Sequence, residues 1–156
     1  MFTKVRKSEF VRSVLAFILI TGKFGFMPVH SVQAATLTVV NTNDSGVGSL
    51  RQALTDAVAG DTVTFDSALS GRTIHLASTL TLAQDITIDG SALVSKITIS
   101  GHSDDNSTGD VQVLDVNTSI TATLDSLIIT KGSFGSGGIW NSGNTLTINN
   151  SMISDQ

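Results

Sequence analysis

The sequence contains no cysteine, and most of its few basic residues lie close to the N-terminus. Disulfides, the usual support of small exported domains, are therefore excluded, and stability must come from packing and hydrogen bonds. A conventional membrane anchor near the N-terminus is also disfavoured. The apolar run Val11–Ile20 is about half as long as the ~20 residues that a membrane-spanning helix needs.

This short apolar run has the surroundings of a signal peptide. Basic residues precede it, and small residues follow at Val32-Gln33-Ala34, in the arrangement of a cleavage site. We therefore expect residues 1–34 to be a signal peptide cleaved after Ala34. The alternative is an uncleaved helix that tethers the chain to a membrane. The expected location is extracellular or at the cell surface, with outer-membrane association if the full-length protein carries an anchor.

The charge of the expected mature chain limits its partners. Residues 35–156 contain four basic residues and twelve aspartates, and no glutamate, which gives a formal net charge of −8. Such a chain repels phosphate backbones, so nucleic-acid binding through counterion release is disfavoured. Anionic lipid surfaces are disfavoured for the same reason.

Short runs rich in threonine, isoleucine, leucine and valine fill the chain from Thr36 onward, separated by Gly, Asn, Asp and Ser. Within Ile86-Thr87-Ile88 the isoleucines share one face and the threonine points to the other. This alternation predicts half-buried β-strands. The runs are Thr36–Val40, Thr62–Phe65, Thr73–Leu76, Leu80–Leu82, Ile86–Ile88, Ile97–Ile99, Val113–Val116, Ile120–Thr130 and Thr145–Ile148.

One segment, Ser49–Ala59, has helical periodicity instead. Its apolar residues recur at spacings of three and four, and we expect Leu50 and Leu54 to be buried. Ser49 is suited to cap the N-terminus of the helix, and Gly60 to end it in a left-handed conformation. Because terminal repeats of a solenoid need a cover, we expect this helix to close the N-terminal end of one.

An internal repeat distinguishes between fold classes. Thr123–Thr130 (TLDSLIIT) aligns with Thr147–Ser154 (TINNSMIS) at an offset of 24 residues, within the range of stacked repeats. The sequence thus predicts an all-β fold, a right-handed parallel β-helix with a short N-terminal capping α-helix. Residues 35–66 would form the cap and 67–156 the turns of the helix, and we expect the repeat to continue beyond Gln156. A β-sandwich is the alternative.

These segments resemble a known family. GSLRQA at Gly48–Ala53 resembles the motif of bacterial CSLREA-type β-helix surface proteins, and the stretch GGIWNSGNTLTINNSMIS resembles their repeats. The resemblance covers residues 36–156 and implies a cell-surface protein of the polymorphic outer-membrane-like class. The family motif usually opens with cysteine. Gly48 replaces it here, which removes any thiol chemistry at that position.

Few residues suggest catalysis. Glycosidases use two carboxyl groups across a cleft, and Asp85, Asp89 and Asp125 are the candidates, yet none lies in a recognisable signature. The sequence contains no nucleophile elbow, and no pair of histidines has the spacing of metal ligands. We therefore expect no catalytic residue and a non-catalytic module for adhesion, display or spacing. The alternative is a carbohydrate-active enzyme, a polysaccharide lyase or glycosidase.

One polar loop has a spacing typical of calcium sites. Asp104, Asn106 and Thr108 occupy positions 1, 3 and 5, and Asp115 falls at position 12, where the loop usually has a bidentate glutamate. The shorter aspartate and the absence of flanking helices favour a solvated insertion between turns. We therefore expect no cofactor, with calcium as the alternative.

Trp140 and Asn141 are the candidate contacts for glycans. An exposed indole beside polar side chains suits a carbohydrate surface, which would make extracellular glycans or proteins the partners. The alternative is structural: asparagines such as Asn144 would fill turn positions and form hydrogen-bonded ladders, with Trp140 packed inward or at the exposed end of the stack.

Overall fold

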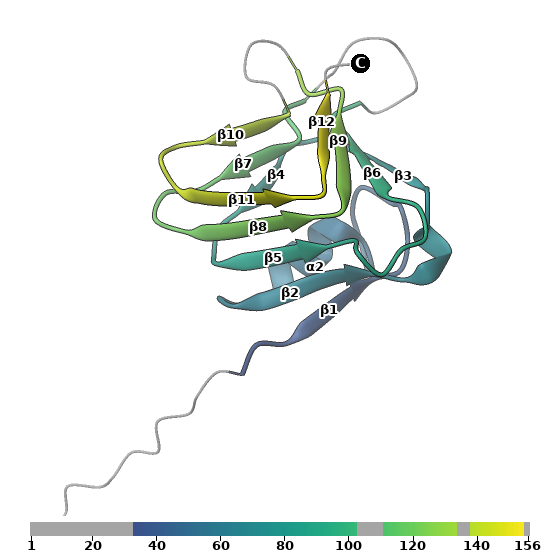
Figure 1. Cartoon of the computed structure of the whole chain (residues 1–156), viewed down its shortest axis with the longest axis horizontal. Helices are drawn as coiled ribbons and strands as arrows, with labels where there is room; N and C mark the ends of the chain where they lie inside the picture. The colour runs from purple at the N-terminus through teal and green to yellow at the C-terminus, as the bar shows by residue number, and fades with distance from the viewer. Residues whose placement is uncertain (1–32, 103–110, 134–137, 155–156) are drawn as a thin grey trace, which may run out of the picture. The chain divides into compact units, whose positions relative to one another are not determined.

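The computed structural model describes residues 33–102, 111–133 and 138–154. In these residues the chain passes repeatedly through three sheets, A, B and C, in the same order (Figure 1). It runs along sheet A, turns back through sheet B and returns behind through sheet C, rising with each turn. This is the right-handed path that parallel crossovers adopt.

Sheet A holds five strands, all parallel, and sheets B and C hold four and three. Each strand pairs with its equivalent in the next turn, so the ladders join residues that are about one turn apart in sequence. Sheet A is β1 (Thr36–Val39), β2 (Asp61–Phe65), β5 (Ile86–Asp89), β8 (Thr121–Asp125) and β11 (Thr145–Asn149). Sheet B is β3 (Thr73–His75), β6 (Ile97–Ser100), β9 (Leu127–Thr130) and β12 (Met152–Ser154), and sheet C is β4 (Leu80–Leu82), β7 (Leu114–Val116) and β10 (Ile139–Asn141).

The predicted parallel β-helix is therefore confirmed, and the β-sandwich alternative is wrong. A sandwich is built from antiparallel sheets, whereas every strand pair here is parallel. The 24-residue offset read from the sequence is the register of β8 with β11 and of β9 with β12: Thr123 pairs with Thr147, and Ile128 with Met152.

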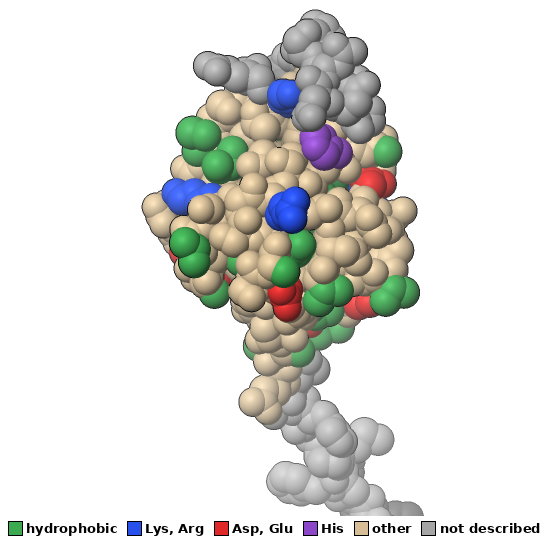
Figure 2. Space-filling view, turned by 90° about the vertical axis from the view of Figure 1, so that its right-hand side faces the viewer, with side chains coloured by type: hydrophobic (Ala, Val, Ile, Leu, Met, Phe, Trp, Pro, Cys, Tyr) green, Lys and Arg blue, Asp and Glu red, His purple; other side chains and the backbone are tan. Residues whose placement is uncertain are grey.

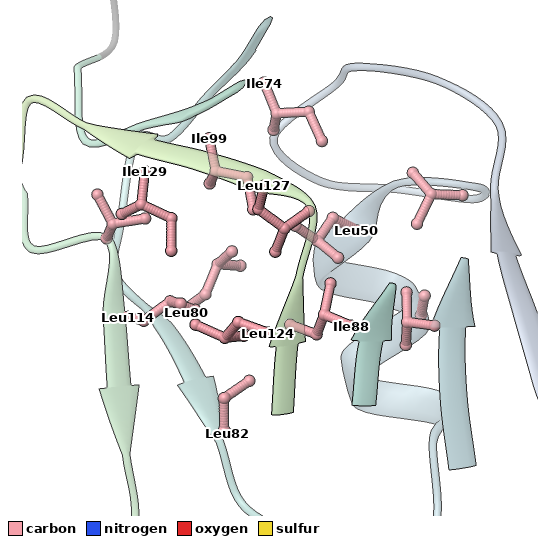
Figure 3. Close-up of a cluster of buried hydrophobic side chains, with 14 of the residues drawn as sticks. Leu50, Ile74, Leu80, Leu82, Ile88, Ile99, Leu114, Leu124, Leu127 and Ile129 are labelled. Atoms are coloured by element: carbon pink, nitrogen blue, oxygen red, sulfur yellow. The ribbon is translucent and has the colours of Figure 1, made fainter. Parts of the chain in front are cut away.

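The core is a set of apolar columns that run through the stack (Figure 3). In sheet A, Val63, Ile88 and Leu124 lie in register and are fully buried. In sheet B, Ile74, Ile99 and Ile129 are likewise in register and fully buried. Because alternate residues of a strand face opposite sides, these columns leave the intervening polar residues on the outer faces of the sheets.

The helix α2 (Leu50–Asp56) is shorter than the sequence predicted. Ser49 caps its N-terminus as expected, accepting a hydrogen bond from Gln52 N–H. The helix ends earlier than predicted, because the backbone of Ala57 is already extended. Gly60 has the expected positive φ of +94°, but it belongs to the turn before β2, where Asp61 N–H donates to Val58 O. Val58 is consequently 48% exposed instead of part of the buried stripe.

As predicted, α2 covers the N-terminal end of the stack. It contacts β1, β2 and β4, and in chain order it takes the place that strands of sheets B and C have in later turns. Leu50 is fully buried, whereas Leu54, expected to be buried as well, is only partly so. Arg51 anchors the helix: its guanidinium donates to Ser78 O and Thr79 O and pairs with Asp44 at 2.6 Å.

The run Ile120–Thr130, expected to form one strand, forms two. Ser126 has a φ of +58° and turns the chain from β8 in sheet A to β9 in sheet B. Strands β10 and β12 are additional to the strands predicted, although the repeat alignment had included the residues of β12. Besides α2, the described residues contain one 3-10 turn, η1 (Ser67–Leu69), and no helix among them is long and apolar enough to cross a membrane.

Candidate functional site

The most regular polar feature is a row of threonines on the outer face of sheet A. One threonine from each of the five strands lies in register with the next, so that the row crosses the whole sheet. Strand spacing places successive members ~4.8 Å apart. We call this row the threonine ladder; it consists of Thr36, Thr62, Thr87, Thr123 and Thr147.

The local sequence explains why these side chains face outward. In each strand an apolar residue follows the threonine, and in the central strands it enters the core, as Ile88 follows Thr87 and Leu124 follows Thr123. The backbone groups beneath are used in the parallel ladders, so the hydroxyls are held on a fixed framework. A fixed spacing of hydroxyl groups suits a ligand that both donates and accepts hydrogen bonds.

A second row runs beside the ladder, two residues further along each strand. Its side chains are hydroxyls on β1 and β2, carboxylates on β5 and β8, and an amide on β11: Thr38, Thr64, Asp89, Asp125 and Asn149. Asp89 accepts a hydrogen bond from Ser91 N–H at 2.8 Å, and Asp125 accepts one from Ser126 Oγ at 2.7 Å. Two of the acids considered for catalysis thus lie in register on neighbouring strands.

An open hollow of about 380 Å³ lies where the strands of sheet A begin. Its lining includes Asp61, Asp85 and members of the threonine ladder. The carboxylate of Asp85 accepts a hydrogen bond from Thr121 N–H at 2.7 Å. Asp61 is almost completely buried, and the N–H groups of Val58 and Ala35, which donate to its carboxylate, lower its pKa below the usual 3.8.

Basic side chains do not converge on these acids among the described residues. Arg51 is committed to the cap, and Lys96 donates to Asn150, which directly follows Asn149 of the second row. On the face formed over sheet B, the few basic side chains lie apart from one another (Figure 2). Among the described residues Arg51 pairs with Asp44, and none of Asp61, Asp85, Asp89 and Asp125 forms an ion pair.

The residues proposed for glycan contact lie at the last strand of sheet C. Trp140 is 51% exposed, and its indole N–H donates to Ser142 Oγ at 2.8 Å. The amide of Asn141 is used within its own turn: Nδ2 donates to Asn144 O, and Oδ1 accepts from Asn144 N–H. Asn144 in turn donates to Val116 O in the preceding turn, at 2.9 Å. Both asparagines thus bond within the stack, and Trp140 belongs to β10, the last described strand of sheet C.

The calcium hypothesis falls largely on residues outside those described, since Asp104, Asn106 and Thr108 all lie in 103–110. Asp115 is described, and it faces outward from β7 while Leu114 and Val116 are buried, as β alternation requires. Within the described ranges, no group of three or more His, Asp or Glu side chains could hold a metal ion.

The histidines occupy one corner of the stack. His75 is partly buried on β3, and its Nδ1 lies 3.1 Å from His102 O in the next turn. His102 is almost fully buried. This contact could not be predicted, because the two residues are 27 positions apart and meet only through the register of β3 with β6.

No known protein family matches the chain, and comparisons with characterised proteins and with solved structures find no match either. The assignment of a function thus depends on the geometry of the chain itself.

Proposed function

We propose that the chain is an exported, non-catalytic β-helix module that serves adhesion, display or spacing, and that its ligand surface is the outer face of sheet A. The threonine ladder carries this proposal. Five hydroxyl side chains in register, on strands held together by parallel ladders, form an ordered surface that costs little entropy when a ligand binds.

The chemistry of this face suits a glycan. Sugar hydroxyls donate and accept hydrogen bonds, and threonine hydroxyls and aspartate carboxylates provide both functions in a fixed array. Asp89 and Asp125, together with the net charge of −8 on residues 35–156, disfavour acidic polymers. Neutral or basic glycans on a cell surface are therefore the proposed ligand class.

A glycan-binding experiment tests the proposal directly. The secreted chain would be applied to an array of neutral, basic and acidic glycans, together with the double variant Thr87→Val, Thr123→Val. This variant keeps the shape and β-propensity of the ladder and removes two hydroxyls, so binding should fall at least tenfold. A matched control is Thr98→Val, an outward-facing residue of sheet B, which should bind as the parent does.

Two results would overturn this assignment: binding unaffected by the double variant, or no glycan bound although circular dichroism shows a folded chain. The same preparations should be compared by thermal unfolding, so that a loss of binding is not mistaken for a loss of structure.

The second candidate is a carbohydrate-active enzyme, and the side-by-side position of Asp89 and Asp125 is the observation that favours it. Glycosidases place two carboxyl groups about 5 to 10 Å apart. Release of reducing ends or unsaturated products from a polysaccharide, abolished by Asp125→Asn but not by Asp115→Asn, would support this candidate over the non-catalytic module.

A further inference from the structure

The side chain of Asp61 is almost completely buried, with 3% of its surface exposed, and it joins two separate parts of the chain. One carboxylate oxygen accepts a hydrogen bond from Val58 N–H, in the turn after α2, at 2.8 Å. The other accepts one from the backbone nitrogen of Ala35, just before β1, at 2.7 Å. Buried charges in proteins are usually paired with an opposite charge, whereas both of these donors are neutral N–H groups.

The surroundings of Asp61 favour a positive charge that no described side chain supplies. The ion pair found among the described residues joins Arg51 to Asp44. The hollow beside Asp61 is lined by a second acid, Asp85, and by no described lysine or arginine. A cation at this place would therefore meet two carboxylates and no repulsive partner along the lining of the hollow.

The nitrogen of Ala35 is the atom that the expected cleavage would convert into such a cation. The pattern Val32-Gln33-Ala34 predicts a cut after Ala34. An α-amino group has an unperturbed pKa of about 7.7 to 8.0, and a neighbouring carboxylate favours its protonated form further. The sequence pattern that predicts the cut and the carboxylate that binds the nitrogen thus point independently to the same atom.

The local structure holds this nitrogen in place without the residues that precede it. Ala35 O accepts a hydrogen bond from Thr62 N–H at 2.9 Å, which extends the pairing of β1 with β2 by one residue. Gln33 and Ala34 are exposed, so their removal takes no buried side chain from the fold. After cleavage the same nitrogen can donate to Asp61 as an ammonium group, and such charge-assisted hydrogen bonds are the stronger kind.

We propose that removal of the signal peptide creates a structural ion pair between the α-ammonium of Ala35 and the carboxylate of Asp61, called here the N-terminal ion pair. In the cut, water adds across the peptide bond, Ala34 leaves with the new carboxylate, and the amine of Ala35 takes up a proton. The ion pair fastens the new N-terminus to the turn between α2 and β2. It rests on the export that is part of the proposed function, and it is separate from the glycan ligand.

Moving the ammonium away from Asp61 tests the charge alone. Two glycines inserted between Ala34 and Ala35 place the new amine about 7 Å further along the chain and leave a peptide N–H on Ala35. We call this the displaced-terminus variant, and mass spectrometry of both secreted products confirms their first residues. Its folding equilibrium constant from urea unfolding should be about threefold lower than that of the parent, as is typical of a partly exposed ion pair.

The variant Asp61→Asn, made in both backgrounds, shows whether this carboxylate is the partner. It removes the charge and keeps the shape of the side chain, so the stability difference between the parent and the displaced-terminus variant should disappear. Asp115→Asn is the matched control. Asp115 faces outward from β7 in sheet C, and its replacement should leave the difference unchanged.

The reactivity of the α-amine gives a second measurement, which decides the matter even where Asp61→Asn does not fold. An acetylating ester reacts with unprotonated amines, and peptide mapping separates the N-terminus from the lysines. Each rate is divided by the rate of the same chain unfolded in urea. This ratio should be about fivefold lower for the parent than for the displaced-terminus variant, because the carboxylate keeps the Ala35 amine protonated.

The possible failures are distinguishable. A secreted chain that begins at Ala35 but has the same stability and amine reactivity as the displaced-terminus variant would overturn the ion pair and leave export intact. A stability difference that persists in Asp61→Asn would overturn it as well, since the ammonium would then have another partner. A secreted product with a different first residue would overturn both the ion pair and the predicted cleavage site, whereas glycan binding is measured separately.

Discussion

Replacing Leu50 by alanine should lower the free energy of unfolding by about 2 to 5 kcal/mol. Leu50 is fully buried where α2 covers the N-terminal end of the stack. Removing three carbons costs roughly 2.4 kcal/mol at about 0.8 kcal/mol for each buried CH₂. The cavity left behind adds to this cost, because strands β1, β2 and β4 that surround the helix are held by their ladders and cannot close the space.

Leu54 is the matched control, from the same helix and of the same residue type. It is only partly buried and borders an open hollow of about 450 Å³ beside Thr79 and Gln84. Water can fill the space left by Leu54→Ala, so the expected loss is about 1 kcal/mol. Because of this hollow, the carboxylate of Leu54→Asp can reach water, and its cost should be smaller than that of Leu50→Asp.

Urea unfolding followed by circular dichroism measures both losses, with the slope of the transition checked for constancy. Equal destabilisation by Leu50→Ala and Leu54→Ala would refute this reasoning, because it would mean that both side chains are sealed beneath the cap. No loss for Leu50→Ala would show that the helix does not contribute to closing the stack.

The remaining predictions concern export, acid stability and calcium. Mass spectrometry of the secreted protein should find Ala35 as the first residue; intact Met1 on material in the medium would contradict the signal peptide. The pKa of Asp61 is lowered in the folded chain, so its carboxylate stabilises the fold above pH 3.8 and this contribution disappears as the pH falls below that value. Asp61→Asn should therefore weaken the fold at neutral pH and make the urea midpoint less dependent on pH in the acid range. An unchanged pH dependence would show that Asp61 does not cause the loss of stability in acid. Thermal unfolding should be the same in millimolar calcium and in chelator, whereas a rise of several degrees that is lost in Asp104→Ala would establish a metal site in the loop.

Much of the fold could be predicted because a β-helix is a local and repetitive structure. The alternation in Ile86-Thr87-Ile88 determines which side chains enter the core, and the 24-residue offset of Thr123–Thr130 is the register of the stacked strands. Each turn contacts only its neighbours, so a short stretch of sequence contains most of the information on its own environment. The Ser49 cap was predictable for the same reason, since it involves residues three positions apart.

Features that depend on corners and on distant contacts could not be predicted. Ser126 adopts a left-handed conformation where the chain changes sheets inside the run Ile120–Thr130, and the polar pair Asp125-Ser126 is the only mark of that corner in the sequence. The end of α2 was misjudged because the buried carboxylate of Asp61 binds Val58 N–H and holds the following turn.

The threonine ladder depends on both the sequence and the tertiary structure. The sequence by itself determined that each threonine faces outward, since period-two alternation is a property of a single strand. Only the tertiary structure decided that five of them align into one row, because loops of unequal length separate the strands and the register is established by stacking of the buried columns. The exposure of Ile148 is likewise a consequence of position in the stack, as the same alternation buries Leu124 one turn earlier.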